Sequence, residues 1–526
     1  MKHTSPENIV SFSESSKVAA CQSKSMADVF RALDRDTDGK VSEADIVDVL
    51  DSQGILYSDP RLVDLRSRLK KYAGKGGMTL PEFSDAVRTR FKLIERATKE
   101  RLVIPRFSGF VPEIDAIFEK TSQIKSGKVA DYIPQLAKVD PENFAVSVCT
   151  VDGQRANFGS ADTAFSVQSV SKLIGYALAL ELNGEDKVHR HVGREPSGQS
   201  FNELSLNPKH LPHNPMVNAG GIMSASLIKP DLPAAERFER VVETWQALSG
   251  GVAPNYNNSV YLSEKLTADR NFALAYFMQE MNAFPKSTDI LQTLDFYFQC
   301  CSISQNTADL STVAATFANA GVCPLTEQRV FSGNTTKNCL SLMYSCGMYD
   351  FSGEFAFTIG LPAKSGVSGV MIIVIPNIMG IAIWSPRLDE LGNSVRGVEF
   401  CKELVKRFNF HTYENVSGSD DKIDPAHTAG ESRNVKVFKL INAACTGDLN
   451  EIARLVAHGI DLNESDYDLR TPLHLAASEG QVAVVQYLLS QGVDADVKDR
   501  WGSTPLDDAL RHNRDDVVGL LNKRAA

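Results

Sequence analysis

The feature that most restricts the fold of this chain is a pattern near its C-terminal end that recurs with a period of about 33 residues. The segment RTPLHLAASEGQVAVVQYLLSQGVDADVKD is echoed by STPLDDALRHNRDDVVGLL, so that Thr471 and Thr504 occupy equivalent positions in the two copies. Gly447 and Gly480 are separated by the same interval, and a more diverged copy begins at INAACTGDLNEIARLVAHGIDLNESD. A unit of this length cannot bury a core alone, so the copies must stack on one another.

A period of this length together with Thr-Pro-Leu-His is typical of ankyrin repeats. We therefore expect residues 434–526 to form an all-α stack of about three repeats. Stacks of this kind usually bind partner proteins or cap a neighbouring region, and they carry no chemistry. The polar stretch at 413–433 is expected to be the linker that precedes the stack.

An acidic loop near the N-terminus predicts a second helical domain. In DRDTDGKVSEAD, aspartates occupy alternate positions and Gly39 stands at the sharp turn. Apolar residues at helical spacing flank this loop, which is the layout of an EF-hand, so we expect an EF-hand-like helical domain at 26–100. Oxygen ligands for Ca²⁺ or Mg²⁺ would come from Asp34, Asp36, Asp38, Lys40 and Asp45.

The last ligand position weakens the expected affinity of this loop. It holds Asp45, whose side chain is shorter than the usual bidentate glutamate, so Ca²⁺ should bind weakly and Mg²⁺ should compete. The segment KGGMTLPEF resembles the end of a second loop that lacks early acidic ligands, and we expect it only to pair with the first. A purely structural role for the first loop stays an open alternative.

Charge and composition exclude several classes of protein. The 526 residues carry a formal net charge of −10, which argues against a nucleic acid or an anionic membrane as partner. No apolar run is long enough to span a bilayer. Nine cysteines without framework spacing favour reduced thiols in an intracellular protein. Residues 1–25 lack the apolar core of a signal peptide, and we expect a disordered leader.

Chemistry in the central region is indicated by a serine three residues before a lysine. This spacing is used by enzymes that attack amides with a lysine-activated serine. It occurs five times here, from Ser67, Ser122, Ser169, Ser226 and Ser419. Only Ser169 opens an almost wholly apolar segment, VSKLIGYALALEL, which predicts a buried helix with the serine in its first turn.

This placement would give the serine and the lysine chemical roles. Lys172 would lie one turn from Ser169 on the same face, and burial would lower its pKa and make it a base. Amides in the first helical turn lack intrahelical acceptors, so they favour developing negative charge. The alternative is a serine N-cap beside a lysine that reaches solvent.

A second motif favours the chemical interpretation. Lys364, Ser365 and Gly366 stand at the entry to an apolar strand, and Lys-Ser/Thr-Gly accompanies Ser-x-x-Lys in penicillin-recognising acyl-transfer enzymes. The N–H of Val367 would then be an oxyanion donor. FAVSVCTVDGQRANFGS predicts two strands and an Asp-Gly turn, and EFAFTIGL, GVMIIVIP and MGIAIWSP predict three further strands. A sheet interrupted by a largely helical stretch predicts an α+β domain with a cleft.

Longer blocks in this region resemble a known family. GKVADYIPQLAKVDPENFAVSVCTVDGQR, SVQSVSK, PHNPMVNAGGIMS, LSEKLTADRNFALAYFM, DFYFQCCSI and CGMYDFSG are similar to the kidney- and liver-type glutaminases of animals. The resemblance is dense over 105–412 and extends to the helical N-terminal region and the ankyrin repeats. It implies a multidomain chain whose catalytic domain, at 105–412, has a serine β-lactamase-like α+β fold and hydrolyses L-glutamine to L-glutamate and ammonia.

The resemblance also implies roles for individual residues. Ser169 would be the nucleophile and Lys172 its base, while Tyr349 would help to move the proton. Catalysis would require no cofactor. The substrate-contacting positions of the family correspond here to Tyr132, Ser169, Asn218, Glu264, Asn271, Tyr297, Tyr349 and Val367.

Assembly and regulation are implied in the same way. The resemblance implies a homotetramer built from dimers, activation by inorganic phosphate and a mitochondrial location, although the leader is a weak targeting signal and a cytosolic location stays open. The loop FNELSLNPKHLPHNP corresponds to one that controls activity in the family. It has Glu203 and Ser205 where kidney-type members have a lysine and an aromatic residue, which weakens the inference about phosphate.

Two other functions stay open at this point. One is an acyl-transfer enzyme that acts on another amide, such as a peptide or a β-lactam. Glu264 argues against it, because an acid in the pocket suits a small amino acid with a free ammonium group. The other is a Ca²⁺-responsive ankyrin scaffold with a non-catalytic core, against which the intact set of Ser169, Lys172 and Tyr349 argues.

Overall fold

The computed structural model describes residues 25–72, 76–198, 202–417, 422–426, 429–457 and 460–522. Two compact units divide the chain, Met1–Thr412 and Tyr413–Ala526. Except for Ser25, the predicted leader lies outside the described residues. Within the described ranges, no helix is both long enough and apolar enough to cross a membrane.

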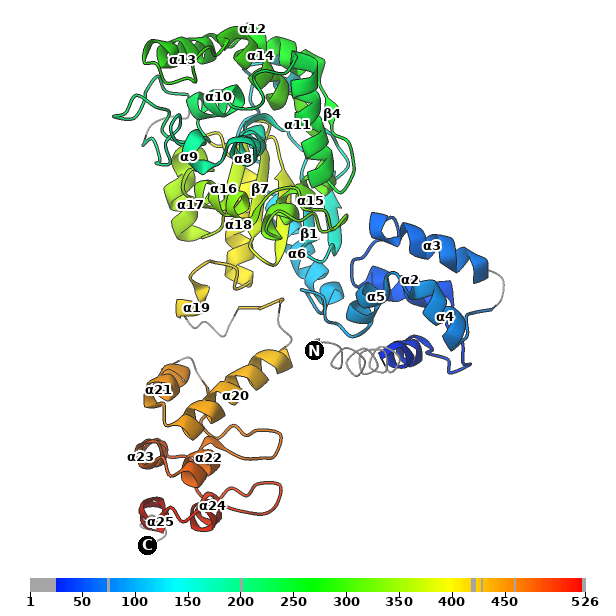
Figure 1. The fold of residues 1–526 in the computed structure, drawn as a ribbon, viewed down its shortest axis with the longest axis vertical. Coiled ribbons are helices and arrows are strands. Elements are labelled where there is room, and N and C mark those ends of the chain that lie inside the picture. The colour runs from blue at the N-terminus through cyan, green and yellow to red at the C-terminus, as the bar shows by residue number, and fades with distance from the viewer. Residues whose placement is uncertain are drawn as a thin grey trace, which may run out of the picture. The chain divides into compact units, whose positions relative to one another are not determined.

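The N-terminal domain is a set of short helices around its own apolar core (blue in Figure 1). The helix over 25–33 and α2 flank the acidic loop. Val41 and Met78 exchange both backbone hydrogen bonds, at 2.9 and 2.8 Å, so the second loop pairs with the first as predicted. The elements after the loop are α2 (Glu43–Ser52), η1 (Pro60–Leu62), α3 (Val63–Leu69), η2 (Lys70–Tyr72), α4 (Leu80–Val87) and α5 (Phe91–Thr98).

A five-stranded antiparallel sheet forms the centre of the next domain, in the order β2-β1-β8-β7-β6. The predicted Asp-Gly turn joins β1 to β2, and the other three strands follow the long helical insertion, which confirms the α+β prediction. A smaller sheet has the order β3-β5-β4. The strands are β1 (Ala145–Thr150), β2 (Arg155–Gly159), β3 (Phe165–Ser166), β4 (Asn255–Tyr256), β5 (Ile303–Gln305), β6 (Ala363–Gly366), β7 (Val370–Ile375) and β8 (Met379–Trp384).

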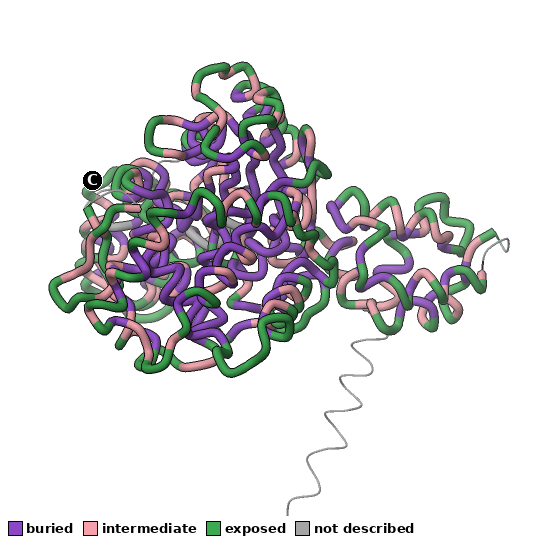
Figure 2. The backbone as a smooth tube through the Cα atoms, turned by 90° about the horizontal axis from the view of Figure 1, so that it is seen from above, coloured by how far each residue is buried: buried purple, intermediate pink, exposed green. Residues whose placement is uncertain are grey.

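Helices cover both faces of the large sheet. A Cβ on Gly380 of β8 would lie 2.1 Å from the amide nitrogen of Ala315 in α15, so this helix packs directly on one face. A Cβ on Gly397 of α18 would lie 2.6 Å from Met371 Sδ of β7, which points to the other face because side chains alternate along a strand. Figure 2 shows the buried backbone concentrated inside this domain.

The remaining helices of this unit lie before, between and after the strands. They are α6 (Phe107–Ser122), α7 (Pro134–Ala137), η3 (Gln168–Val170), α8 (Ser171–Asn183), α9 (Glu185–Val188), α10 (Asn218–Ser226), α11 (Ala234–Leu248), α12 (Asn258–Leu266), α13 (Asp269–Glu280), α14 (Ile290–Cys301), α15 (Thr307–Ala318), α16 (Gly333–Cys346), η4 (Tyr349–Phe351), α17 (Ser352–Thr358) and α18 (Val395–Arg407).

One predicted strand is wrong. EFAFTIGL contributes most of α17 and no strand, because Phe355 and Ile359, four residues apart, are buried, while Phe357 between them is exposed. That spacing is helical, and an alternating reading would have buried Phe357 as well. The strand on that side of the sheet is β6, formed by the Lys-Ser-Gly motif itself and paired with β7.

The turn between β1 and β2 is held by the N-terminal domain. Asp152 accepts hydrogen bonds from both Arg96 Nη atoms, each at 2.7 Å. Gln154 is fully buried, and its Nε2 donates to the carbonyls of Gln53 and Ile104, each at 3.0 Å. These hydrogen bonds therefore anchor the β1–β2 hairpin to the end of α2 and to the segment after α5.

The C-terminal unit contains three helix pairs, as the period predicted. Thr471 and His474 form a capping box, and His474 Nε2 lies 3.2 Å from the carbonyl oxygen of Ser503 in the next repeat. Thr-Pro-Leu-His therefore both starts a helix and ties two repeats together. Helix α20 begins at Ala429, inside the predicted linker. The helices are α19 (Glu414–Ser417), α20 (Ala429–Thr446), α21 (Leu449–Ala457), α22 (Pro472–Glu479), α23 (Val482–Ser490), α24 (Pro505–Arg511) and α25 (Asp515–Asn522).

Candidate active site

Ser169 lies in the 3-10 turn η3 that leads directly into the buried helix α8, rather than in the first turn of α8 itself. The residue before it, Gln168, has a φ of +47°, a left-handed conformation that is uncommon for side chains of this kind. Ser171 Oγ donates to the Gln168 carbonyl at 2.7 Å and so holds this turn. The backbone around the serine is strained, as is common at functional sites.

Lys172 is the direct partner of Ser169. Its Nζ lies 2.6 Å from Ser169 Oγ, and both side chains are buried. Burial lowers the pKa of Lys172 from 10.5, because the charged amine loses its hydration. Gly221 makes room for the lysine, since a Cβ there would lie 3.1 Å from Lys172 Cε. A hydroxyl and an amine of reduced basicity are therefore in contact in a dry environment.

Tyr349 lies beside this pair in the turn η4, with a φ of +55°. Burial raises the pKa of its phenol, and a hydrogen bond with Ser169 opposes the rise. Lys364 packs against Tyr349, with its Nζ 4.7 Å from the centre of the tyrosine ring. The same amine donates to the carbonyls of Ser365 and Gly347, at 2.6 and 3.3 Å. Burial and the neighbouring charge of Lys172 place the pKa of Lys364 well below 10.5.

A cavity of about 350 Å³ opens onto Ser169. It gathers residues from η3, α8, α10, α12, α13, α14 and the turn after β6, which are distant in the sequence. Of the predicted site residues, all except Tyr349 line it: Tyr132, Ser169, Lys172, Asn218, Glu264, Asn271, Tyr297 and Val367. Tyr349 joins the site through Ser169.

Glu264 is the only carboxylate among the described residues that line this cavity. Its Oε1 accepts hydrogen bonds from Tyr132 Oη at 2.7 Å and Gln168 Nε2 at 3.0 Å. Burial raises the pKa of Glu264, and the bonds from Tyr132 and Gln168 oppose the rise. A half-buried acid that keeps two donors is suited to a cationic group of a bound molecule.

Two amides and a phenol form another polar group in the cavity. Asn218 Nδ2 donates to Asn271 Oδ1 at 3.0 Å, and Tyr297 Oη donates to Asn218 Oδ1 at 3.4 Å. Uncharged donors of this kind suit a carboxylate.

The sequence did not single out every residue of this cavity. Gln168, Arg270 and Cys301 also line it. Cys301 follows Tyr297 by four residues on α14, so helical spacing could have found it. Its Sγ lies 3.5 Å from Ser171 Oγ. The sequence gives no comparable signal for Gln168, because its place in the cavity depends on its left-handed backbone conformation.

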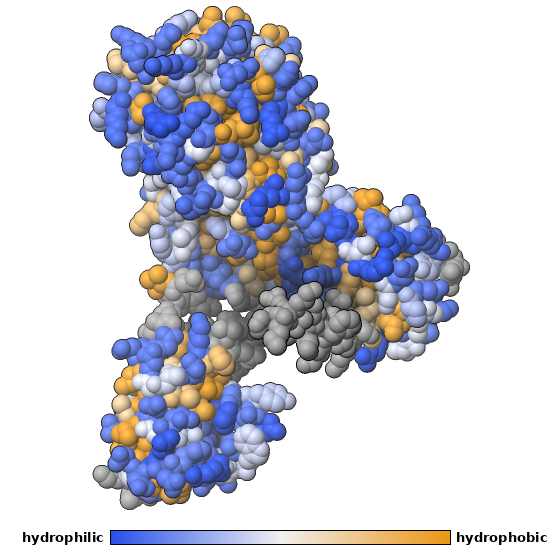
Figure 3. All heavy atoms as spheres, in the orientation of Figure 1, coloured by the Kyte–Doolittle hydropathy of each residue, from blue (hydrophilic) through white to orange (hydrophobic). Residues whose placement is uncertain are grey.

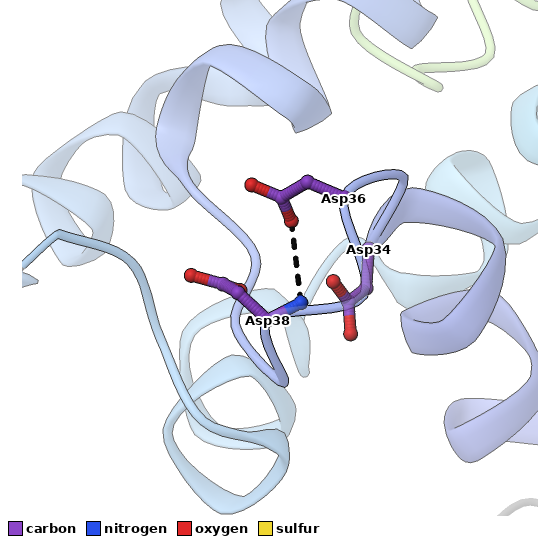
Figure 4. Close-up of side chains that lie close together, drawn as sticks. All are labelled: Asp34, Asp36 and Asp38. Atoms are coloured by element: carbon purple, nitrogen blue, oxygen red, sulfur yellow. Dashed lines mark hydrogen bonds between the residues drawn. The ribbon is translucent and has the colours of Figure 1, made fainter.

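The acidic loop of the N-terminal domain is the candidate cation site (Figure 4). One carboxylate oxygen from each of Asp34, Asp36 and Asp38 lies within 4.8 Å of the other two. Asp45 does not join them, because its Oδ2 accepts from the amide and hydroxyl of Ser42, at 2.8 and 2.6 Å, and caps α2. Lys40 has only its backbone carbonyl oxygen to offer a cation, and its amide donates to Asp38 Oδ1 at 2.8 Å.

Comparisons with known proteins agree with this organisation. The family model for glutaminase matches residues 127–413, that for an EF-hand domain matches 26–105, and that for ankyrin repeats in three copies matches 440–526. A mitochondrial liver isoform of glutaminase from Rattus norvegicus is 46% identical over 477 residues, which is 90% of this chain and 79% of the relative. A putative glutaminase 2 from Caenorhabditis elegans is 45% identical, with 91% and 82% covered.

A solved structure gives the same result for the central domain alone. A probable glutaminase superposes with a TM-score of 0.55 at 36% identity, covering 57% of this chain and 97% of the other. The buried serine and lysine, the cavity and these matches lead to one conclusion. This chain belongs to the glutaminase family of amidohydrolases, with an EF-hand domain before its serine β-lactamase-like catalytic domain and ankyrin repeats after it.

Proposed function

We propose that the chain hydrolyses L-glutamine to L-glutamate and ammonia through an ester on Ser169. The observation that supports this most directly is the 2.6 Å contact between Ser169 Oγ and a buried lysine amine. An amine that has lost its proton can take the serine proton as the oxygen attacks, which a solvated lysine does poorly near neutral pH.

Substrate orientation follows from the polar groups of the cavity. Glu264 pairs with the α-ammonium group of glutamine, while Asn218, Asn271 and Tyr297 donate to the α-carboxylate. The side-chain amide then reaches toward Ser169. A cavity of about 350 Å³ suits a small amino acid, which favours glutamine over a peptide or another larger amide. Family membership also favours an enzyme over a non-catalytic scaffold.

We propose that two backbone amides stabilise the oxyanion. A Cβ on Gly366 would lie 3.5 Å from the amide nitrogen of Ser169, so the end of β6 approaches the nucleophile closely. Val367, the next residue, lines the cavity. We assign the N–H groups of Ser169 and Val367 to the oxyanion, which develops only in the transition state.

The proposed reaction has two halves. Ser169 Oγ bonds to the amide carbon while its proton passes to Lys172 Nζ; the C–N bond then breaks, and the leaving nitrogen takes a proton from Lys172 or through Tyr349. Ammonia departs and leaves a glutamyl ester. Water attacks this ester, gives a proton to Lys172, and the Ser169 oxygen recovers a proton as glutamate leaves. No cofactor takes part in any step.

The test is ammonia release by Ser169→Ala. We expect turnover to fall by at least about 10³-fold, since removal of a nucleophile leaves only binding and oxyanion stabilisation. Ser67→Ala is the matched control, because Ser67 heads another Ser-x-x-Lys on the short helix α3, outside the catalytic domain. An electrophilic glutamine analogue should modify Ser169 in the parent protein. Wild-type turnover in Ser169→Ala, or labelling elsewhere, would refute the assignment.

We also propose that the acidic loop binds Ca²⁺ weakly. Asp34 Oδ1 is buried and has no hydrogen-bond partner among the described residues, so a cation would satisfy it. Asp36 and Asp38 would supply further oxygens. Calorimetry on the full chain should show binding that disappears in Asp34→Ala and persists in Asp51→Ala, which removes an exposed acid near the end of α2. Absence of heat in the parent would contradict this proposal.

The relatives support an inference about location, but not about assembly. The names of the rodent relatives include mitochondrial, and we infer the same compartment for this chain. The homotetramer, the phosphate activation and an ankyrin-bound protein partner stay predictions. The control loop holds Glu203 and Ser205, so a phosphate titration of ammonia release tests the weakest of these inferences.

A further inference from the structure

The ankyrin stack carries two loop tips that are built alike. One runs between α21 and α22 and the other between α23 and α24, and they project on the same side of the stack (Figure 1). Asp466 Oδ1 accepts from the amides of Asp468 and Arg470, each at 2.9 Å. In the next tip, Asp499 Oδ1 accepts from the amides of Trp501 and Ser503, at 2.9 and 2.8 Å. Both tips are therefore held in one defined backbone conformation.

The two tips are also joined to each other. The Arg500 amide donates to the Asp468 carbonyl at 2.9 Å, and Arg500 Nη1 pairs with Asp468 Oδ1 at 2.7 Å. Arg470 is paired with Asp466 at 3.0 Å. Both arginines are thus neutralised within the tips, which form one rigid surface.

Large apolar side chains stand exposed on this rigid surface. Tyr467 is 95% exposed, Leu469 is 53% exposed and Trp501 is 63% exposed. Aromatic side chains presented on a fixed backbone lose little conformational entropy on binding, which is why they dominate binding hot spots. We define these three residues as the tip surface.

Leu469 provides a separate indication of function. It has a φ of +60°, a left-handed conformation that is unfavourable for a leucine. The equivalent position in the next repeat is Gly502, with a φ of +85°. The Leu469 amide donates to the Asp466 carbonyl, and the Gly502 amide donates to the Asp499 carbonyl, each at 3.0 Å. The turn has the same hydrogen bond in both repeats, so a glycine is sufficient to form it. A strained and exposed leucine therefore stands where glycine would form the same turn.

Acidic side chains stand on the same two loops as the tip surface. Asp461, Asp494 and Asp496 are exposed, and within the described part of the chain no cationic side chain is paired with them. Asp494 is linked to the neighbouring loop through its amide, which donates to Asn463 Oδ1 at 3.0 Å. Figure 3 shows hydrophilic residues prevailing over the projecting loops. These carboxylates repel phosphate groups, which excludes a nucleic acid or an anionic membrane.

We propose that the tip surface binds a segment of another protein in which lysine or arginine alternates with large apolar side chains. The apolar residues would pack on Tyr467, Leu469 and Trp501, and the cations would face Asp461, Asp494 and Asp496. This interaction is independent of the glutaminase reaction, so the two can fail separately.

The test uses the full-length chain and a labelled peptide of alternating lysine and leucine. Fluorescence anisotropy should show binding that weakens when glutamate replaces the lysines, and also when serine replaces the leucines. We expect Trp501→Ala to weaken binding about tenfold or more, whereas Phe438→Ala, which removes a 71% exposed aromatic from α20, should leave it unchanged.

Leu469→Gly separates binding from folding. The variant should melt at the same temperature or higher, because it relieves the strain, yet it should bind the peptide several-fold more weakly. Asp494→Asn combined with Asp496→Asn should reduce the salt dependence of binding. The proposal is overturned if the three peptides bind equally, if Trp501→Ala and Leu469→Gly bind like the parent, or if Phe438→Ala weakens binding as much as they do. Ammonia release should be unchanged in all of these variants.

Discussion

The catalytic cleft and the acidic loop both begin from a short sequence motif, but they are completed in different ways. The three aspartates of the loop lie close together in the sequence, and their oxygens converge through the local turn alone. Ser169 and Lys172 are equally close in sequence, yet the cleft also needs Glu264, Tyr297, Tyr349 and Val367 from four other segments. A local motif can therefore bring three carboxylates together, whereas the cleft depends on how the rest of the chain folds over the motif.

Because the cleft depends on side chains that the fold buries, we expect the largest effect on ammonia release from removing the buried amine of Lys172. Lys172→Met should lower ammonia release by about 10³-fold or more, because the base in contact with the nucleophile is lost. The variant should be at least as stable as the parent at neutral pH. Below the unfolded pKa of 10.5, the unfolded lysine binds more protons than the buried one, so its burial costs stability, and this cost decreases as pH rises.

The pH profile supplies the control for this prediction. The parent should gain kcat/KM as pH rises through the lowered pKa of Lys172, with a midpoint below 10.5. Lys172→Arg keeps a charge and should show neither this limb nor activity. A parent profile that stayed flat at every pH where the fold persists would argue against lysine as the base.

A second prediction concerns the ion pairs that connect the N-terminal domain to strand β2. Asp59 is fully buried and accepts from Arg61 Nη2 at 2.9 Å and Arg155 Nη2 at 3.4 Å, so it links the N-terminal domain to β2. Asp59→Ala should cost about 3–5 kcal/mol of unfolding free energy, since it leaves two largely buried arginines without this partner.

Chemical denaturation of the full chain measures this effect. Asp64→Ala is the control, because Asp64 forms a solvent-exposed pair with Arg68 at 2.9 Å and its loss should leave the free energy of unfolding nearly unchanged. Equal costs for the two substitutions would show that the buried pair contributes nothing special to the junction.

A third prediction tests recognition in the cleft. Glu264→Gln should lower kcat/KM for glutamine by about 100-fold, mainly through KM, because the substrate ammonium group loses its charged partner. Glu243→Gln alters an exposed acid on α11 and should have no effect. If Glu264→Gln changed only kcat, the carboxylate would act in the chemistry and not in substrate binding.

The smallest predicted effect belongs to the local site. Asp45→Glu should strengthen Ca²⁺ binding about tenfold, or roughly 1.4 kcal/mol, since a longer acid reaches the ion while the shorter one caps α2. Calorimetry measures the affinity, and ammonia release without added Ca²⁺ should be unchanged. A loss of stability with no gain in affinity would mean that the residue at position 45 serves to cap α2 with Ser42 and not to bind Ca²⁺.

Much of the fold could be predicted because its signals are local. The helix pairs of the ankyrin stack, the β1–β2 hairpin and the loop pairing between Val41 and Met78 each follow from spacing over short stretches of the sequence. The error at EFAFTIGL shows the limit, since a short apolar run carries too few residues to distinguish a strand period from a helix period.

The candidate site was predicted unevenly for a related reason. The resemblance placed the residues that line the cavity, but the residue pattern alone gave no sign of Gln168, whose left-handed backbone precedes the nucleophile. Ser42 and Asp45 have the spacing of a capping box, but the pattern did not decide whether Asp45 would cap α2 or face the acidic loop. Both depend on competition between hydrogen-bond partners, which spacing does not resolve.

By itself, the sequence determined the repeat architecture, the acidic loop and the one-turn separation of Ser169 from Lys172, because helical and turn geometry fix such short distances. The apolar run after Ser169 also predicted burial, but only the tertiary structure decided which distant residues surround the pair. Lys172 packs against Gly221 and Tyr297, which come from other helices, and burial there lowers its pKa. No local pattern can report which residues of distant segments pack around a side chain.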